Sequence, residues 1–335
     1  MKNKMLSKKM VHSVSAKQND WIQACMLAAK DDGYFRSFRS YSAFQRVVEG
    51  TPKSGGVWNL KRLLSDKLFV DLIPVIQSSD TIGLPLNMID VHLPLSKSNV
   101  SKERAYSLSP TTIRYANNAI NCMKLFGKDV FNGGTDIYEI GSGYGGECKI
   151  FNDFSTYLFK KTLGKNWHIF DLKSSEGVIK RFLSVFGYKA KFKALESIKI
   201  KSGSDSLAIS NAAFSEMNGS LLDDYFDNVI AKCGMGYFIT NFESQSAPYG
   251  GWKTDDFIER LKKAGKTDVL VLPTKDYLSL FDSQAGSKII IFGYKSLPDQ
   301  LTPSGREFLF GLSHYADEMF ILLKRMLIGL PIKYF

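Results

Sequence analysis

The residues best suited to chemistry lie between Thr135 and Glu147, in the stretch TDIYEIGSGYGGE. The stretch predicts a short apolar strand, a glycine-rich turn and a helix over 146–163. Because glycine lacks a Cβ, Gly141, Gly143 and Gly145 allow a positive φ and a close approach of the backbone to a ligand. The start of the helix would direct free N–H groups and its positive dipole end at that ligand. The pattern therefore predicts a nucleotide-like cofactor.

The identity of the cofactor depends on Glu139. Gly141, Gly143 and Gly146 also satisfy the dinucleotide pattern G-x-G-x-x-G, and the glycines could simply form a tight turn. Glu139 precedes the first glycine by two residues, where class I methyltransferases carry an acid. Its charge would repel a pyrophosphate but attract the amino group and sulfonium of S-adenosyl-L-methionine (SAM). We therefore favour SAM as the cofactor and include Ser142 among its contacts.

From Asp136 onward the pattern alternates between strand and helix, which is typical of a doubly wound α/β sheet. The predicted strands are Asp136–Ile140, Trp167–Leu172, Lys189–Leu195, Ser206–Asn211, Gly236–Asn241, Thr267–Pro273 and Lys288–Tyr294, and the predicted helices include Ser175–Phe186, Ser220–Lys232 and Lys253–Ala264. Only a loop or a short helix fits between the last two strands. This arrangement matches the methyltransferase sheet with its antiparallel final strand, whereas a dinucleotide domain normally ends in parallel strands.

Polar residues follow several predicted strands at the edge where such sheets bind ligands. Asp171 ends the second strand, where an acid commonly holds ribose hydroxyls, although it lies 30 residues after Gly141 and the usual spacing is about 20. The fourth and fifth strands are followed by Asn211, Ser215, Glu216, Asn241 and Glu243. We expect at least one of these five in the site, with helix capping as the alternative for Ser215 and Glu216. His168 in mid-strand is expected to be a core histidine.

The region before the glycine motif is predicted to be helical. Apolar residues recur at helical spacing over 21–80, with Pro74 bending or ending one helix, and 81–108 is predicted to be irregular. The aromatic and basic segment Tyr34–Arg46 is predicted to pack as an amphipathic helix, with a basic–aromatic binding surface as the alternative. We predict that residues 1–130 form a lid over cofactor and substrate.

One helix in this region is clearly delimited. Ser109 is a suitable N-cap, Pro110 fits the first turn, and Gly127 follows the last turn. The helix leads directly into the glycine-rich strand, so we expect Arg114 and Tyr115 beside the cofactor. Arg114 could pair with the SAM carboxylate or form an ordinary ion pair.

The net charge of +11 is concentrated at the two ends of the chain. Residues 1–20 carry five lysines and one aspartate, and 321–335 carry three basic residues and no acid, so seven of the eleven excess charges lie there. This distribution does not favour nucleic acid as a partner, since a basic groove would place the charge in the catalytic domain. Basic tails could still attract an anionic membrane surface.

The cysteines and the hydropathy indicate a cytoplasmic protein. The four cysteines are far apart in the sequence and form no C-x-x-C pair, so we expect reduced, buried thiols. No stretch approaches the ~18 consecutive apolar residues of a membrane span. The segment 297–335 is predicted to be an amphipathic helical tail that mediates self-association or peripheral contact with the inner face of a membrane, whereas 131–296 is predicted to be the SAM-binding domain.

Several segments together resemble the sugar O-methyltransferases, a family of class I SAM-dependent enzymes. The matching segments are SPTTIRY at 109–115, YEIGSGYGGECKI at 138–150, IFDL at 169–172, SNAAFSEM at 210–217 and GYFITN at 236–241, with a weaker match of DTIGLP at 80–85. The resemblance covers about residues 80–245. It implies methyl transfer to a sugar hydroxyl in glycan or polysaccharide biosynthesis, with a carbohydrate as the acceptor.

A sugar hydroxyl needs a general base to become a good nucleophile. Glu216 is our first candidate because it lies in the most family-specific segment, and Glu243 is the second. His92 or His314 could enter from outside the sheet. Mg²⁺ could acidify the hydroxyl instead, since the acids and amides after the fourth and fifth strands are oxygen ligands, but the sequence contains no recognisable metal motif.

Two other functions remain open. An NAD-dependent sugar oxidoreductase or epimerase would need a hydride-transfer pair such as Tyr-x-x-x-Lys after the fourth strand, and none stands out. A nucleic-acid methyltransferase would carry an N-P-P-Y or D-P-P-Y box, but the fourth strand continues as SNAAF. The sequence does not specify the sugar or the hydroxyl.

Overall fold

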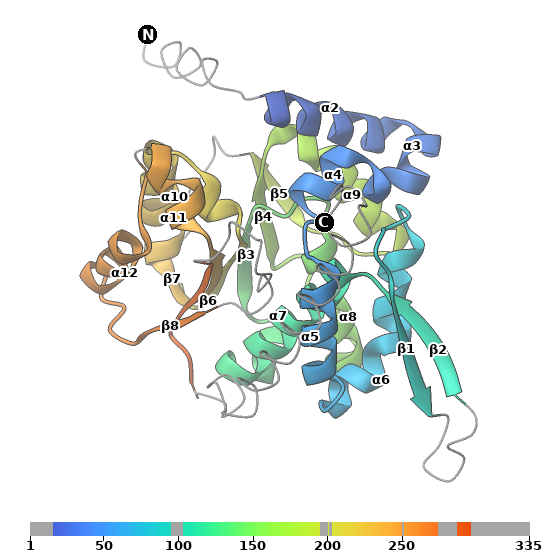
Figure 1. Ribbon diagram of the computed structural model, residues 1–335. Coiled ribbons are helices and arrows are strands. Elements are labelled where there is room, and N and C mark those ends of the chain that lie inside the picture. The colour runs from blue at the N-terminus through green and yellow to red at the C-terminus, as the bar shows by residue number, and fades with distance from the viewer. Residues whose placement is uncertain are drawn as a thin grey trace, which may run out of the picture.

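A seven-stranded mixed sheet lies at the centre of the molecule. The computed structural model describes residues 16–94, 103–194, 200, 203–249, 251–273 and 287–295. The strands follow the order β5-β4-β3-β6-β7-β9-β8 (Figure 1), and β9 is antiparallel to both of its neighbours. Their bounds are β3 Asp136–Ile140, β4 Trp167–Asp171, β5 Lys191–Ala194, β6 Gly203–Asn211, β7 Cys233–Thr240, β8 Val269–Pro273 and β9 Lys288–Phe292. All predicted strands are present, and the Rossmann-like α/β class with an antiparallel last strand is confirmed.

The chain changes direction across the sheet beside β3. It first builds outward through β4 and β5, and then returns to the other side of β3 with β6. In an open α/β sheet, ligands bind outside the carboxyl ends of the strands at such a switch point. The loop that leaves β3 there is Gly141–Gly145. The topology therefore places the predicted cofactor motif where the sheet opens.

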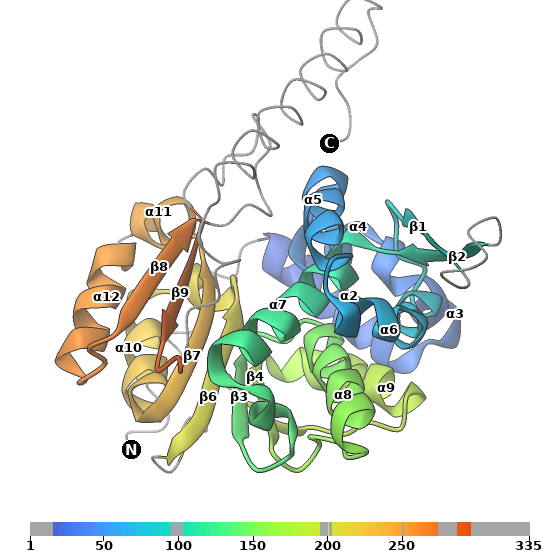
Figure 2. The same cartoon turned by 90° about the horizontal axis from the view of Figure 1, so that it is seen from below.

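Helices cover both faces of the sheet and form two hydrophobic cores (Figure 2). One face packs against α10 (Gly219–Asn228), α11 (Phe242–Gln245) and α12 (Thr254–Lys263). The other packs against α7 (Pro110–Phe126), α8 (Gly146–Phe159) and α9 (Glu176–Val185). Helix α8 ends earlier than predicted because Lys160 adopts a left-handed conformation that closes the helix.

Helix α7 is the element that connects the N-terminal region to the sheet. As predicted, Ser109 caps it, with its Oγ accepting a hydrogen bond from the Thr112 N–H at 3.1 Å, Pro110 occupies its first turn, and Gly127 ends it. Every residue from Pro110 to Cys122 is buried, because α7 packs against α8 and against the N-terminal helix α5 (Lys53–Leu63).

The N-terminal helices share a hydrophobic core with the sheet. Besides α5 they are α2 (Ala16–Lys30), α3 (Asp32–Ser37), α4 (Ser42–Val47) and α6 (Lys67–Ile76). Helix α2 packs on α9, where Arg181 Nη1 donates to the carbonyls of Ala28 and Asp31 at 3.2 and 3.1 Å. Pro74 lies inside α6, close to its end.

The prediction that residues 81–108 are irregular was wrong. Strands β1 (Ile89–Pro94) and β2 (Glu103–Leu108) form a separate antiparallel pair, visible beside α6 in Figure 1. In β1, buried Ile89 and Val91 alternate with the exposed residues between and after them, which is the pattern of a half-buried strand. This alternation is short and was obscured by the prolines and serines around it.

The phenylalanines of Tyr34–Arg46 form part of the core, as predicted, although Tyr41 is exposed and the segment folds as short helical pieces instead of one helix. Phe38 and Phe44 are fully buried, and the Phe38 ring contacts the Tyr144 ring edge-on at 5.3 Å between centroids. Arg39 is also fully buried, which the sequence did not indicate. The segment therefore packs directly against the residue at the centre of the glycine-rich loop.

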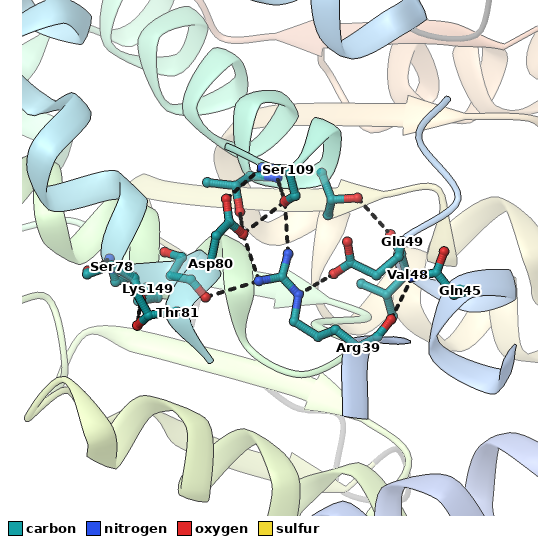
Figure 3. Close-up of polar contacts among 12 residues, drawn as sticks. Arg39, Gln45, Val48, Glu49, Ser78, Asp80, Thr81, Ser109 and Lys149 are labelled. Atoms are coloured by element: carbon teal, nitrogen blue, oxygen red, sulfur yellow. Dashed lines mark hydrogen bonds and ion pairs between the residues drawn. The ribbon is translucent and has the colours of Figure 1, made fainter. Parts of the chain in front are cut away.

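Buried Arg39 is held by two carboxylates (Figure 3). Its Nε donates to Glu49 Oε1 at 2.6 Å, and its Nη1 donates to Asp80 Oδ1 at 2.8 Å. Asp80 also accepts hydrogen bonds from the Ser109 N–H at 2.7 Å and from Thr112 Oγ1 at 2.7 Å. The segments DTIGLP and SPTTIRY thus meet around one guanidinium, which fixes the N-terminal region to the start of α7.

Replacing Arg39 by methionine should lower the free energy of unfolding by about 3–5 kcal/mol, because it leaves the buried carboxylates of Glu49 and Asp80 without their cation. Arg46→Met is the matched control: Arg46 pairs with Asp20 at the surface, where such pairs contribute about 0–1 kcal/mol. Urea denaturation measures both. Equal losses in the two variants would contradict a structural role for the Arg39 cluster.

The structure bears on the predictions about the cysteines and about membrane spans, but it does not describe the two ends of the chain. All four cysteines are buried and none forms a disulfide, as expected. Among the described residues, no helix is both long and apolar enough to cross a bilayer. The predicted tail at 297–335, the basic residues before Ala16 and His314 lie outside the described residues.

Candidate functional site

The glycine-rich loop adopts the backbone conformation that its sequence predicts. Gly141, Gly143 and Gly145 have φ values of +78°, +61° and +92°. A Cβ added to Gly141 would lie 2.0 Å from the Ala213 Cβ, and one added to Gly143 would lie 2.9 Å from a methyl carbon of Val48. Gly141 and Gly143 are therefore needed for packing against the turn after β6 and against the N-terminal region, as well as for positive φ.

Asp171 fixes this loop from the end of β4. Its Oδ2 accepts hydrogen bonds from the Ser142 and Gly143 N–H groups at 2.8 and 3.1 Å, and its Oδ1 accepts from the Leu172 N–H at 2.6 Å. Burial raises the pKa of Asp171, although these N–H groups oppose the shift. Two N–H groups that could bind a phosphate are thus already occupied by a carboxylate, which makes the loop a poor pyrophosphate site.

Glu139 is a buried acid directly below the loop. Its side chain is 1% exposed, and its Oε2 accepts a hydrogen bond from Trp167 Nε1 at 2.7 Å. Within the described part of the chain, its Oε1 has no hydrogen-bond partner. Burial and the nearby Glu147 carboxylate raise the pKa of Glu139 to about 8. A buried carboxyl with an unsatisfied oxygen is suited to a ligand that brings a positive charge.

Helix α7 contributes the two predicted residues that approach the loop from the N-terminal side. Tyr115 is buried against the start of α8, since a Cβ added to Gly146 would lie 2.6 Å from its ring. Arg114 is also buried and donates from Nη2 to the Val48 carbonyl at 3.3 Å. Burial raises the pKa of Glu147 and of Glu216, and the charge of Arg114 opposes both shifts, so Arg114 lies near both acids.

The exit of β6 is a strained turn beside the loop. Ala212 has φ +71° and ψ −38°, a region that residues other than glycine rarely adopt, and such strain often occurs at functional sites. The turn is stabilised because Ala212 donates to the Ile239 carbonyl at 2.9 Å and accepts from Ser215 Oγ at 2.7 Å. The side-chain amide of Asn211 forms no hydrogen bond of normal geometry to the described residues, although it lies close enough to Glu147 to lower the pKa of that carboxyl.

Glu216 and Glu243 lie in different environments. Glu216 keeps an exposed surface, but desolvation by the surrounding protein raises its pKa, opposed by the Asn241 amide and Arg114. Glu243 accepts a hydrogen bond from the Thr254 N–H at 3.1 Å at the start of α12. Burial alone would raise the pKa of Glu243, but its bonds to Thr254 and the charge of Lys288 lower it. Glu216 is therefore the stronger base, and Glu243 caps a helix.

The other polar candidates have structural partners. Buried Ser215 and Asn241 are linked, because the Asn241 N–H donates to Ser215 Oγ at 2.9 Å and Asn241 Oδ1 is an alternative acceptor for the Ser215 hydroxyl. The Nε2 of His168 lies 3.2 Å from Asp136 Oδ1, as expected for a core histidine. His92 is exposed on β1. Among the described residues, no cluster of three His, Cys, Asp or Glu side chains could hold a metal ion.

The structure brings most of the predicted cofactor residues together. Glu139, Asp171 and the loop that contains Ser142 form one unit, and Arg114, Tyr115 and Asn211 border it. Two residues that lie next to the loop were not predicted. Glu147 was interpreted only as the start of a helix, although its carboxyl is buried and accepts a hydrogen bond from Asn118. Val48 comes from an N-terminal segment with no local signal, and only the tertiary fold places it over Gly143.

Comparison with known proteins adds little to this geometry. No protein-family model matches the chain, and no curated protein does. Among the solved structures that are similar in part is an O-methyltransferase family protein from Burkholderia thailandensis, with 10% identity, a TM-score of 0.37, and a match over 53% of this chain and 56% of that chain. PigF with SAH has 12% identity, a TM-score of 0.33, and a match over 48% of this chain and 50% of that chain. The Pyrococcus abyssi tRNA (uracil-54, C5)-methyltransferase in complex with S-adenosyl-L-homocysteine has 12% identity, a TM-score of 0.33, and a match over 61% of this chain and 43% of that chain. The matches span about half the length of these proteins. Similarity this low carries no functional argument, so we base the function on the site itself.

Glu139→Gln should stabilise the ligand-free protein at neutral and alkaline pH. The pKa of Glu139 is raised from 4.5 to about 8 in the folded state, so the folded protein binds more protons than the unfolded chain, and stability falls as pH rises through this window. Glutamine does not titrate. The advantage of the variant should therefore grow between about pH 4.5 and 8 and then level off.

Urea denaturation at about pH 5, 7 and 9 measures this effect. Glu259→Gln is the control, because Glu259 is exposed on α12 and should show no such trend. A constant difference between Glu139→Gln and wild type across this range would mean that the Glu139 carboxyl is already ionised at the lowest pH.

Proposed function

We propose that the protein is a SAM-dependent O-methyltransferase that transfers a methyl group to a sugar hydroxyl. The observation that carries the proposal is the pairing of the loop N–H groups with Asp171 directly above buried Glu139. A pyrophosphate would meet two carboxylates and occupied donors, whereas a sulfonium or ammonium group would be attracted. The strand order with antiparallel β9 supports the same class, and the sugar acceptor rests on the family resemblance.

The residues around the loop fit the parts of SAM. Glu139 lies where it would attract the positive charge, Arg114 would pair with the carboxylate, and Asn211 would offer its side-chain amide. Asp171 keeps acceptor capacity for a ribose hydroxyl beyond its three N–H donors. When bound, SAM supplies the electrophilic methyl group.

The acceptor hydroxyl must lose its proton, and Glu216 is the group to receive it. Its raised pKa brings this carboxylate closer to the operating pH, which strengthens it as a general base. It stays exposed and so can be reached by a carbohydrate. Glu216 follows the strained turn of Ala212, which sets the direction of the chain at this end of β6.

Calorimetry with SAM, S-adenosyl-L-homocysteine (SAH) and NAD⁺ tests the cofactor. SAM and SAH should bind with Kd values of about 1–100 μM, the usual range for enzyme substrates, and NAD⁺ should give no heat. Asp171→Asn should weaken both SAM ligands about 10-fold, since a neutral amide holds the loop N–H groups less tightly. Binding of NAD⁺ without either SAM ligand would overturn the proposal.

Glu216→Gln should leave SAM affinity unchanged and lower turnover by about 10²–10⁴-fold, the usual contribution of a general base. Methyl transfer from labelled SAM to sugar nucleotides and to oligosaccharides provides the measurement. Glu243→Gln, which alters a helix cap, should retain turnover within about 3-fold of wild type. If Glu243→Gln shows the larger loss of turnover, the roles of the two acids are reversed.

A further inference from the structure

Glu147 is a buried acid in the first turn of α8, and it has no role in the methyl transfer proposed above. Its side chain is buried, and its Oε1 accepts a hydrogen bond from Asn118 Nδ2 at 2.8 Å. Asn118 Oδ1 accepts a hydrogen bond from the Tyr237 hydroxyl at 3.4 Å, and that hydroxyl accepts one from Asn121 Nδ2 at 3.1 Å. A polar chain from α7 and β7 therefore holds this carboxylate in place.

The positively charged side chain of Arg114 lies near the Glu147 carboxylate. Arg114 and Asn118 are four residues apart on α7, so both side chains lie on the same face of the helix. That face meets α8, because Asn118 donates to Glu147. Burial raises the pKa of Glu147, and the Asn118 hydrogen bond, the charge of Arg114 and the nearby Asn211 amide at the exit of β6 oppose this shift. Glu147 and Arg114 thus lie together between α7, the start of α8 and the carboxyl end of β6.

Two buried acids and one buried cation share this cluster. Glu139 and Glu147 repel each other, and Arg114 is the cation that acts on Glu147. A buried charged group is costly unless it has a partner of opposite charge. A ligand group that places a positive charge beside Glu147 and a negative charge beside Arg114 would give both residues such a partner. A free α-amino acid group carries both charges, on two groups bonded to the same carbon.

We propose that Glu147 and Arg114 form the subsite for the α-amino-acid end of the ligand, with Glu147 accepting from the ammonium group and Arg114 donating to the carboxylate. This inference rests on the proposed function, since SAM and SAH both carry such an end. It assigns Glu147 as a binding residue and the Asn118–Tyr237 chain as the support that positions it.

The test compares two neutral thioethers, SAH and 5′-methylthioadenosine, which lacks the amino-acid end. Their affinities for wild type, Glu147→Gln and Arg114→Gln are measured by calorimetry. Each substitution should weaken SAH about 10- to 50-fold, as expected for the loss of one charged hydrogen bond, and change 5′-methylthioadenosine less than 2-fold. Asp153→Asn is the matched control: it removes a buried carboxylate of the same helix, paired with Lys149, and should leave the ratio of the two affinities unchanged.

The outcomes separate the two proposals. An equal loss of both thioethers in Glu147→Gln and Arg114→Gln would overturn the subsite, because the residues would then act only through the structure of the site. If Glu147→Gln or Arg114→Gln does not fold, Asn118→Ser is measured instead, and it should reproduce part of the selective loss of SAH affinity. An equal loss of affinity for SAH and 5′-methylthioadenosine in Asn118→Ser would again overturn the subsite. If wild type binds 5′-methylthioadenosine and SAH equally well, the subsite is wrong but the cofactor class stands. If it binds neither SAM nor SAH, the proposed function itself fails.

Discussion

The hydrogen bonds from the Ser142 and Gly143 N–H groups to Asp171 are the interaction on which the site depends. They join the end of β4 to the loop that leaves β3, so two neighbouring strands and the cofactor loop form one rigid unit. They also reverse the usual electrostatics of a glycine-rich loop. Free N–H groups at the start of a helix attract anions, but here a carboxylate occupies them. The same sequence pattern thus provides a site with acidic rather than basic character.

The protein has two clusters of buried charged residues, one around Arg39 and one around the glycine-rich loop, and they differ in how fully their polar groups are paired. Around Arg39, every strong donor is matched by Glu49, Asp80 or nearby oxygens, and the cluster needs no ligand. Around the glycine-rich loop, Glu139 has one oxygen without a hydrogen-bond partner among the described residues, and a second acid, Glu147, lies near it. Buried polar groups are normally satisfied, so the incomplete cluster is the one that a ligand would complete.

The sheet could be predicted from the sequence because its signals are local. Strand and helix patterns alternate from Asp136 onward, and the capping residues of α7 occur at their expected positions. The β1–β2 hairpin was missed because its alternation is only a few residues long. At the site, the glycines and Glu139 could be found from their spacing, and Asp171 from its place at the end of a predicted strand. The partners of Glu243 and Glu147 could not, because Thr254 and Asn118 approach them only through the tertiary fold.

The N-terminal region was predicted to form a lid. Its packing also determines when its helices can be covered during synthesis. Phe38 contacts Tyr144, and α2 packs on α9, where Arg181 reaches back to Ala28. These contacts join residues more than 100 positions apart, and 153 in the case of Arg181 and Ala28; such long-range contacts form late in folding. Helices α5 and α6 pack on α7 and α8, which are made earlier, but during synthesis the apolar residues of α2 stay uncovered until α9 has left the ribosome. A nascent chain that stalls before that point would expose them, so this region should depend on chaperones more than the sheet that follows it.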